Sequence, residues 1–364
     1  MVKKYKNPDI IILMSVSILI LFGLVMIYSS SAVYAYDNFG DFAYFFKKQL
    51  VWMLIGFFTM ILFINIDYND LKKVITPFYV LTILLLVFVL VYGKSIGGAQ
   101  RWIKIGVLTF QPSEMARITV LIMLAYFIDR KRSRINTLKR GILPALVIVG
   151  IPSSLILLQP DLGIPFLIVS VCLAMLYMGG AHIKHLTGIV VLSLPMLAFS
   201  IIKYPYRLKR MLTFLNPWAD PQGAGYQITQ SMLALGSGGF AGKGLGGSNI
   251  KLLYLPTPHT DFIFPIIGEE LGFIGCMALI GLFVLIAVRG LMISRRAANL
   301  FGTILCAGFT FMLTFQAFLN LAVATGTLPT KGISLPFLSF GGSSLIFNMA
   351  AVGIILNISR QAKE

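Results

Sequence analysis

Asp261 is the residue whose type and position first indicate a reaction. It stands in the stretch YLPTPHTDFIFPIIGEELG, residues 254–272, in a chain with only 13 acidic residues among 364. Pro256, Pro258 and Pro265 restrict the backbone around it. A carboxylate held in a half-desolvated cleft has a raised pKa and can accept a proton near neutral pH. The alternative is an N-cap of the apolar helix that follows, although no Glu or Gln stands three residues later to complete a capping box.

The ionisable neighbours of Asp261 suit different roles. His259 lies two residues before it, which fits an orienting or electrostatic role. Glu269 and Glu270 follow at eight and nine residues, roughly 12–13 Å along a helix at 1.5 Å per residue, too far for a carboxylate dyad. We expect these two glutamates to face the bundle interior as a structural or cavity-lining pair, and one to meet a buried Arg or Lys. With basic groups nearby to hold an anionic substrate, Asp261 favours transfer chemistry at the outer membrane surface.

Three other places carry charge in or beside apolar segments, where each ionisable group costs about 2.5–3.5 kcal/mol on insertion scales. Glu114 and Arg117 stand at i and i+3, either as a mutually neutralising pair or as the wall of a polar cavity. Asp161, in QPDLG, is expected to form an Asx turn or to cap the next helix. Arg101, beside Trp102, is either an interfacial anchor or a phosphate contact.

Motifs for metal or nucleotide binding are absent. The sequence contains no HExxH, no P-loop and no GxGxxG before a helix. The three cysteines lie in apolar segments and are expected to pack rather than to bind metal or form disulfides. The GxxxG of Gly268 and Gly272 favours close helix packing. The sequence therefore predicts no dedicated metal site.

Composition places these residues in a membrane protein. Hydrophobic residues make up 57% of the chain and charged residues 12%, half the usual share of a soluble domain. The mean hydropathy is +0.87. Apolar runs of about 20 residues recur, and each can cross a bilayer, whereas a β-barrel would show short alternating strands. We predict an all-α, polytopic membrane protein, one domain over 1–364, with ten spans at 9–31, 47–66, 74–92, 113–129, 141–158, 162–179, 184–202, 264–290, 298–323 and 338–358.

The positive charges set the expected orientation. An even number of spans puts both termini on one side, and the first apolar run is too long for a cleaved signal peptide. Lys and Arg cluster before span one, in loops 67–73 and 130–140, and after spans eight and ten. By the positive-inside rule that side is cytoplasmic. The net charge of +17 then largely reflects this topology together with attraction to anionic lipid, and it does not favour nucleic-acid binding.

The predicted outer segment 203–263 is too long for a simple connection. YPYRLKRMLTFLNPW mixes basic and apolar residues in a way that suits a helix lying in the membrane interface. YQITQSMLALGSGGF is expected to form a second, partly buried helix, and GGFAGKGLGGSN is expected to be flexible. Long ordered loops are often functional, so we expect this one to fold back over the membrane domain.

Five motifs together resemble one known family. They are RWIKIGVLTFQPSEMAR, QPDLG, NPWADPQGAGYQITQS, YLPTPHTDFIFPIIGEELGFIG and TGTLPTKGISLPFLSFGGSSLI, and they span essentially the whole chain. In this order and on consistent faces they resemble the SEDS family, which includes FtsW, RodA and SpoVE. The short tails and the wording LPTPHTDFIF look closer to the FtsW and SpoVE branch.

The resemblance implies a peptidoglycan glycosyltransferase that polymerises lipid II on the outer face of the bacterial cytoplasmic (inner) membrane. Its ten-helix fold has a large outer loop between helices seven and eight. The family's catalytic aspartate corresponds to Asp261, which would act as general base for inverting displacement of undecaprenyl pyrophosphate. The candidates to stabilise the negative charge that develops on the leaving pyrophosphate are Arg101, ranked first, with Lys104, Arg117 and Lys331. The candidate substrate-binding or cavity residues are Arg101, Lys104, Glu114, Arg117, Asp161, His259, Thr260, Lys331 and Ser343.

The resemblance also implies partners and leaves alternatives. No cofactor is certain, although a divalent cation, Mg or Mn, could assist at the pyrophosphate. The expected partners are lipid II, membrane lipid and a class B penicillin-binding protein, a transpeptidase that would cover apolar faces on helices eight and nine. A lipid II flippase and a non-catalytic scaffold that recruits the transpeptidase are the alternative functions. A role in division, elongation or sporulation is left open.

Overall fold

The computed structural model describes residues 7–96, 99–105, 108–203, 205–248, 250, 259–329 and 332–362. Within this part of the chain there are twelve α-helices and three short strands. The helices are α1 Ile10–Phe39, α2 Tyr44–Asn65, α3 Leu71–Tyr92, α4 Pro112–Arg130, α5 Leu143–Leu157, α6 Gly163–Met178, α7 Ile183–Lys203, α8 Pro205–Leu215, α9 Tyr226–Ser237, α10 Ile263–Arg295, α11 Leu300–Ala324 and α12 Gly342–Arg360.

Every predicted span coincides with a helix, but not all of these helices have the length and apolarity of a membrane span. Among the described residues, seven qualify by those criteria: α1, α2, α10, α11, α12, the helical run Tyr68–Tyr92 and the run Leu138–Leu157. Helix α6 and the first part of α7 are apolar but shorter. Helix α4 carries Glu114, Arg117, Asp129 and Arg130 and is buried inside the bundle over most of its length. Buried charges of this kind lower hydropathy without exposing a polar face to lipid.

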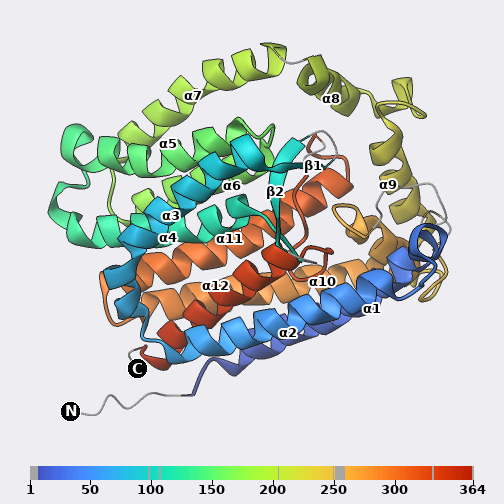
Figure 1. Cartoon of the computed structure of the whole chain (residues 1–364), viewed down its shortest axis with the longest axis horizontal. Coiled ribbons are helices and arrows are strands. Elements are labelled where there is room, and N and C mark those ends of the chain that lie inside the picture. The colour runs from blue at the N-terminus through green and yellow to red at the C-terminus, as the bar shows by residue number, and fades with distance from the viewer. Residues whose placement is uncertain are drawn as a thin grey trace.

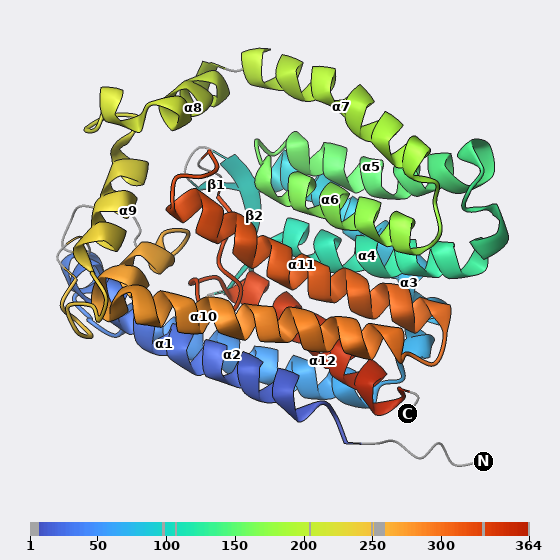
Figure 2. The ribbon, with the colours of Figure 1, turned by 180° about the vertical axis from the view of Figure 1, so that it is seen from behind.

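The segment ends that were predicted to be cytoplasmic meet at one end of the bundle. The Asp9 backbone N–H donates to Ser359 Oγ at 3.0 Å, and the Asp9 carboxylate pairs with Arg289. At the same end the Asn299 amide donates to Asn69 Oδ1 at 2.8 Å. Helix α1 therefore begins where α12 ends, as Figures 1 and 2 show, which agrees with an even number of crossings.

Helices α4, α11 and α12 form the centre, and α7 lies outermost. The central helices are lined by buried apolar residues along most of their length. Most described side chains of α7, by contrast, are exposed. Figures 1 and 2 both show α7 and α8 arching along the edge of the bundle, with α9 descending to the N-terminal end of α10. The predicted helices in segment 203–263 are thus present as α8 and α9.

A small antiparallel sheet departs from the all-α prediction. Strands β1 Lys94–Ile96, β2 Ala99–Ile105 and β3 Leu108–Phe110 pair in the order β1-β2-β3. Lys94 pairs with Trp102, and Ile103 pairs with Phe110. The β-branched and aromatic residues of the stretch Arg101–Ile105, namely Trp102, Ile103 and Ile105, are types enriched in strands, although they do not alternate strictly with polar residues. The sheet carries Arg101 to the end of the bundle that also holds Asp261.

Helix α10 is interrupted at Gly272, in the predicted GxxxG. Its φ of 65° and ψ of −163° lie in a region that is essentially restricted to glycine. The next two amides leave the helical pattern and donate to the carbonyls of Gly239 and Phe240, at 2.9 and 3.2 Å. The glycines do allow close packing, as predicted, and the partner is the 238–244 stretch that follows α9.

Substituting Gly272 tests this interruption. Gly272→Ala should lower the thermal midpoint, because the backbone conformation costs about 1–3 kcal/mol for other residues. Its Cβ would also clash with the Gly242 nitrogen and the Phe240 carbonyl. Gly281→Ala, in the same helix with open space around the added carbon, is the control and should be neutral or slightly stabilising. Equal melting of the two purified variants would contradict the account.

Candidate active site

Asp261 lies just before α10, at the end of the bundle opposite the Asp9–Ser359 contact. Its backbone carbonyl accepts a hydrogen bond from Asn320 Nδ2 of α11 at 2.8 Å. A Cβ placed on Gly332 would lie 3.3 Å from Asp261 Oδ2, so the backbone at residue 332 faces the carboxylate. The N-cap position of α10 is Phe262 and has no side-chain capping hydrogen bond. The N-cap alternative for Asp261 is therefore wrong.

The electrostatic surroundings of Asp261 favour its protonated form. Burial raises the pKa of this carboxyl to about 6, and the nearby Asp161 carboxylate acts in the same direction. The guanidinium groups of Arg101 and Arg210 oppose the rise. A carboxyl with a pKa near 6 is mostly ionised at pH 7 and still basic enough to take a proton, which is the range expected of a general base.

Arg101 and Asp161 join the small sheet to the turn between α5 and α6. Arg101 Nε donates to the Gln159 carbonyl at 2.8 Å, and its Nη2 donates to the Pro160 carbonyl. Its Nη1 lies 3.6 Å from Asp161 Oδ2. Arg101 therefore holds the 159–161 turn in place through these contacts, and it is not simply an interfacial anchor.

Asp161 caps the start of α6. Its Oδ1 accepts from the backbone N–H groups of Gly163 at 2.9 Å and Ile164 at 3.3 Å. The predicted Asx-turn or N-cap role is confirmed. Burial raises the pKa of the Asp161 carboxyl, and Arg101 opposes that rise. Asp161 thus has a structural role and is also close enough to influence the charge on Asp261.

The ring of His259, two residues before Asp261, is surrounded by three aromatic side chains. Its ring centroid is 4.1 Å from Phe45, 5.6 Å from Phe340 and 5.8 Å from Tyr34. Its carbonyl accepts from the Phe340 N–H at 2.9 Å. Burial lowers the pKa of His259 to about 4, so the ring is neutral at pH 7. These contacts fit the orienting role suggested for His259, and they do not supply a positive charge.

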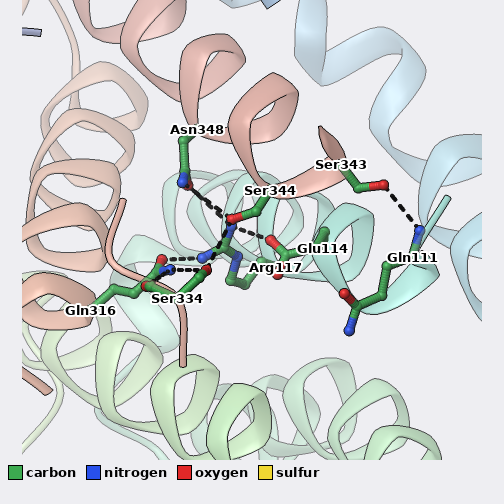
Figure 3. Close-up of polar contacts among 8 residues, drawn as sticks. All are labelled: Gln111, Glu114, Arg117, Gln316, Ser334, Ser343, Ser344 and Asn348. Carbon is green, nitrogen blue, oxygen red and sulfur yellow. Dashed lines mark hydrogen bonds and ion pairs between the residues drawn. The ribbon is translucent and has the colours of Figure 1, made fainter. Parts of the chain in front are cut away.

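Glu114 and Arg117 belong to a buried polar cluster (Figure 3). Arg117 pairs with Glu114, donates to Gln316 Oε1 of α11, and donates to Asn348 Oδ1 of α12 at 3.0 Å. The Arg117 and Glu114 side chains are only 1% and 7% exposed. The predicted neutralising pair is present, and it connects three helices.

The cluster extends to the 332–341 segment, which joins α11 to α12. Gln316 Nε2 donates to the Ser334 carbonyl at 2.8 Å, and Ser334 Oγ lies 3.4 Å from Ser344 Oγ. Figure 3 shows Gln316 and Ser334 on one side of Arg117 and Glu114 on the other. The charges of α4 are thereby tied to the same segment that faces Asp261.

The other predicted site residues are separated. Ser343 accepts from the Gln111 N–H and donates to the Thr109 carbonyl, each at 3.1 Å, so it fastens α12 to the start of α4. Lys104 is exposed on β2, and Thr260 adjoins Asp261 and is partly exposed. Lys331 lies outside the described residues. The structure thus brings Asp261 together with Arg101, Asp161 and His259, while Glu114 and Arg117 form a separate cluster.

Glu269 and Glu270 are fully buried and face different elements. Glu269 pairs with Lys243 at 2.6 Å and accepts from Ser248 Oγ, which holds the Gly-rich stretch against α10. Glu270 accepts from Ser29 Oγ of α1 at 2.7 Å. The predicted structural role is therefore confirmed, but the basic partner of Glu269, Lys243, is partly exposed rather than buried. The Gly-rich stretch is anchored by these contacts, contrary to the flexible loop that its composition suggested.

Sequence reasoning missed Gln316, Asn320 and Arg210 as site residues. Gln316 and Asn320 lie one turn apart in an apolar helix, where no charge or motif singles them out. Arg210 is one of several basic residues in the outer segment, and its influence on Asp261 depends on where α8 lies. Over the described ranges, no group of three or more His, Cys, Asp or Glu side chains could hold a metal ion.

Fold and site together define a multi-pass helical membrane protein with a candidate acid–base carboxylate beside basic groups at one end of its bundle. The family model described as a cell cycle protein, for FtsW, RodA and SpoVE, matches residues 9–364. The chain belongs to this family.

Individual relatives match over nearly their whole length. The probable peptidoglycan glycosyltransferase FtsW of Geobacter sp. strain M18 is 40% identical over 363 residues, covering 99% of each chain. Stage V sporulation protein E of Bacillus subtilis is 40% identical over 365 residues and all of both chains.

Solved structures agree in fold. A chain of a peptidoglycan synthase complex, studied for how polymerisation and crosslinking are coordinated, superposes with a TM-score of 0.81 at 31% identity, covering 97% of this chain and 98% of that one. Rod shape determining protein RodA of Thermus thermophilus gives 0.73 at 27% identity, covering 98% of each chain. The higher identity to FtsW and to the sporulation protein agrees with the predicted branch.

The raised pKa of Asp261 predicts a stability effect with a definite sign. Between pH 3.8 and about 6 the folded protein binds more protons than the unfolded chain, so the free energy of unfolding falls as pH rises through this window. Asp261→Asn should therefore melt at a higher temperature than the parent at pH 7.5, and the gain should vanish near pH 4.

Asp41 is the control of opposite sign. Its carboxylate is exposed, and its pKa is lowered by Lys47 and by the Ala43 N–H. Asp41→Asn should give no gain at pH 7.5. Thermal unfolding of the detergent-purified proteins measures both, and a gain for Asp261→Asn that is equal at pH 4 and 7.5 would contradict the assignment.

Proposed function

We propose that this protein is a peptidoglycan glycosyltransferase, which polymerises lipid II into β-1,4 glycan strands on the outer face of the bacterial cytoplasmic membrane. The observation that carries the proposal is the place of Asp261. It stands in a family motif, its carboxyl is buried enough to raise its pKa to about 6, and two guanidinium groups act on it. Relatives that match over the full length carry the name peptidoglycan glycosyltransferase.

The proposed reaction is a single inverting displacement. Asp261 takes the proton from the 4-hydroxyl of the acceptor sugar as that oxygen attacks the anomeric carbon of the donor. The bond from that carbon to undecaprenyl pyrophosphate breaks, and the electron pair leaves with the pyrophosphate. One carboxylate base is sufficient, since a retaining reaction would need a second carboxylate about 5–5.5 Å away as nucleophile.

Positive charge is needed where the pyrophosphate departs. Arg101 and Arg210 suit this role, because both act electrostatically on Asp261, and Lys104 is exposed on the same strand as Arg101. Arg117 suits it less well, since its guanidinium is buried and bonded to Glu114, Gln316 and Asn348. A divalent cation, Mg²⁺ or Mn²⁺, would supply further positive charge at the substrate phosphates, and Asp161 would help to hold it while Asp261 stays free to act as base.

The membrane arrangement follows the sequence prediction. We place ten spans across the cytoplasmic membrane, both termini inside, and segment 203–263 with Asp261 on the outer face. The meeting of the basic segments at the Asp9–Ser359 end supports this orientation through the positive-inside rule. The seven long apolar helices support a multi-pass protein.

The proposed partner is a class B penicillin-binding protein, which would crosslink the strands. The half of α10 next to Asp261 supports it, because apolar residues there are exposed: Phe273, Ile274 and Met277. Helix α11 offers less surface than the sequence suggested, since most of its residues are buried and Phe318 is its one large exposed hydrophobic residue in the described chain. The similar synthase complex was studied for coordinated polymerisation and crosslinking.

A reconstituted assay tests the catalytic proposal. Asp261→Asn, in proteoliposomes with lipid II and the cognate transpeptidase, should abolish glycan chains, because the general base is lost while the fold is retained. Asp41→Asn is the control and should polymerise normally. Normal chain formation by Asp261→Asn would refute the mechanism. Lost translocation of lipid II with intact polymerisation would favour the flippase, and the scaffold predicts neither loss.

The partner surface can be tested separately. Phe273→Ala with Ile274→Ala should weaken transpeptidase binding by about thirtyfold or more, since anchor residues typically contribute more than 1 kcal/mol each. Phe58→Ala, exposed on α2, is the control. Binding measured in nanodiscs should separate them, and equal affinities would remove α10 from the interface.

A further inference from the structure

Asn320 connects three parts of the candidate site. It lies on α11, with its side chain facing the end of the bundle that holds Asp261. Its Nδ2 donates to the Asp261 carbonyl at 2.8 Å and to the Ile333 carbonyl at 2.7 Å. A side-chain amide has two N–H groups, so both donors are used, one on each chain segment.

The Asn320 side chain of the bridge is buried. Asn320 is 2% exposed, and its Oδ1 has no hydrogen-bond partner among the described residues. A buried unpaired carbonyl typically costs about 1–3 kcal/mol. A residue whose only task was to fill space would avoid that cost, because leucine has nearly the same shape. The orphaned Oδ1 therefore indicates that the two N–H contacts matter to the protein.

Two further contacts show what the bridge determines. The carbonyl of His259 accepts from Phe340, so the Asp261 segment is tied to segment 332–341 a second time. Gly332, next to Ile333, faces the Asp261 carboxylate. A Cβ built on Gly332 would lie 3.3 Å from Asp261 Oδ2. The distance between the Asp261 and Ile333 carbonyls thus sets how the carboxylate lies against Gly332.

Gln316 repeats the pattern one turn earlier on α11. Its Nε2 donates to the Ser334 carbonyl at 2.8 Å, while its Oε1 accepts from Arg117. Two successive backbone carbonyls of segment 332–341 are therefore held by two amides four residues apart on one rigid helix. Gln316 links segment 332–341 to the buried Glu114–Arg117 pair, whereas Asn320 links the same segment to Asp261.

We propose that Asn320 is a positioning residue for glycosyl transfer, whose amide holds the Asp261 and Ile333 carbonyls together and so fixes the Asp261 carboxylate against segment 332–341. The inference rests on the proposed function, since it assigns a role in the same reaction. Asn320 does not touch the reacting atoms in this account. It acts through Asp261, and a misplacement of about 1 Å at a reacting group can cost about 10²-fold in rate.

The test compares two buried asparagines. Asn320→Leu removes both donors and keeps the volume. Asn357→Leu is the matched control, because Asn357 is equally buried on α12 and bonds to the Ile64 carbonyl and the Tyr68 N–H at the opposite end of the bundle. Asn320→Ser, which keeps one short donor, is the milder variant if the leucine variant does not fold. Each is reconstituted with lipid II, and kcat, KM and the pH dependence are measured.

Asn320→Leu should lower kcat about 10²-fold with KM nearly unchanged. The acid limb of kcat/KM should move from about pH 6 toward 3.8, since a released carboxylate becomes better solvated and less influenced by Asp161, and burial, the largest cause of the raised pKa, outweighs the loss of the opposing Arg101 and Arg210 charges. Asn320→Ser should show the same shift with a smaller loss, and Asn357→Leu should keep the parental acid limb.

Loss of activity in proportion to the folded fraction, with an unmoved acid limb, would make Asn320 merely structural and overturn the inference. So would full activity of Asn320→Leu or Asn320→Ser beside an inactive Asp261→Asn. A polymerising Asp261→Asn protein would instead overturn the proposed function.

Discussion

The buried guanidinium of Arg117 is the interaction on which the rest of the bundle depends. It is bonded to Glu114 on its own helix, to Gln316 on α11 and to Asn348 on α12. Removing one partner of such a buried pair typically costs about 3–5 kcal/mol, because a charge is left without compensation. The three central helices therefore have one arrangement in which this charge is satisfied, and that arrangement determines where segment 332–341 lies.

The candidate site is built outward from this cluster. Gln316 and Asn320 hold segment 332–341 to α11, and Asn320 also holds Asp261. On the other side Arg101 and Asp161 fix the turn before α6. The Asp261 carboxyl is thus kept where burial disfavours its charged form. Keeping the Asp261 carboxylate in surroundings that destabilise its charged form lowers the stability of the protein. Such a loss of stability is typical of functional sites.

Part of this could be predicted from sequence. The ten helices follow from apolar runs about one bilayer long, and the cap at Asp161 follows from an Asp before a Gly at a turn. The three strands within residues 94–110 were missed because β1 and β3 have only three residues each, and the seven residues of β2 do not alternate polar and apolar side chains. Asn320 and Gln316 were missed because the role of an amide side chain on a helix depends on which backbone carbonyls lie next to it. The sequence does not show that segments 259–262 and 332–341 pack against α11. Lys243 was missed as the Glu269 partner because 26 residues separate them and glycine-rich composition suggested a flexible loop.

The most direct measurement of the central claim is the pH dependence of polymerisation by the parent protein in lipid II proteoliposomes. If the Asp261 carboxylate is the base, kcat/KM should be level above about pH 6 and fall about tenfold for each pH unit below it, because the protonated carboxyl cannot accept a proton. A rate that stays level down to pH 4.5, with the protein still folded, would contradict the claim.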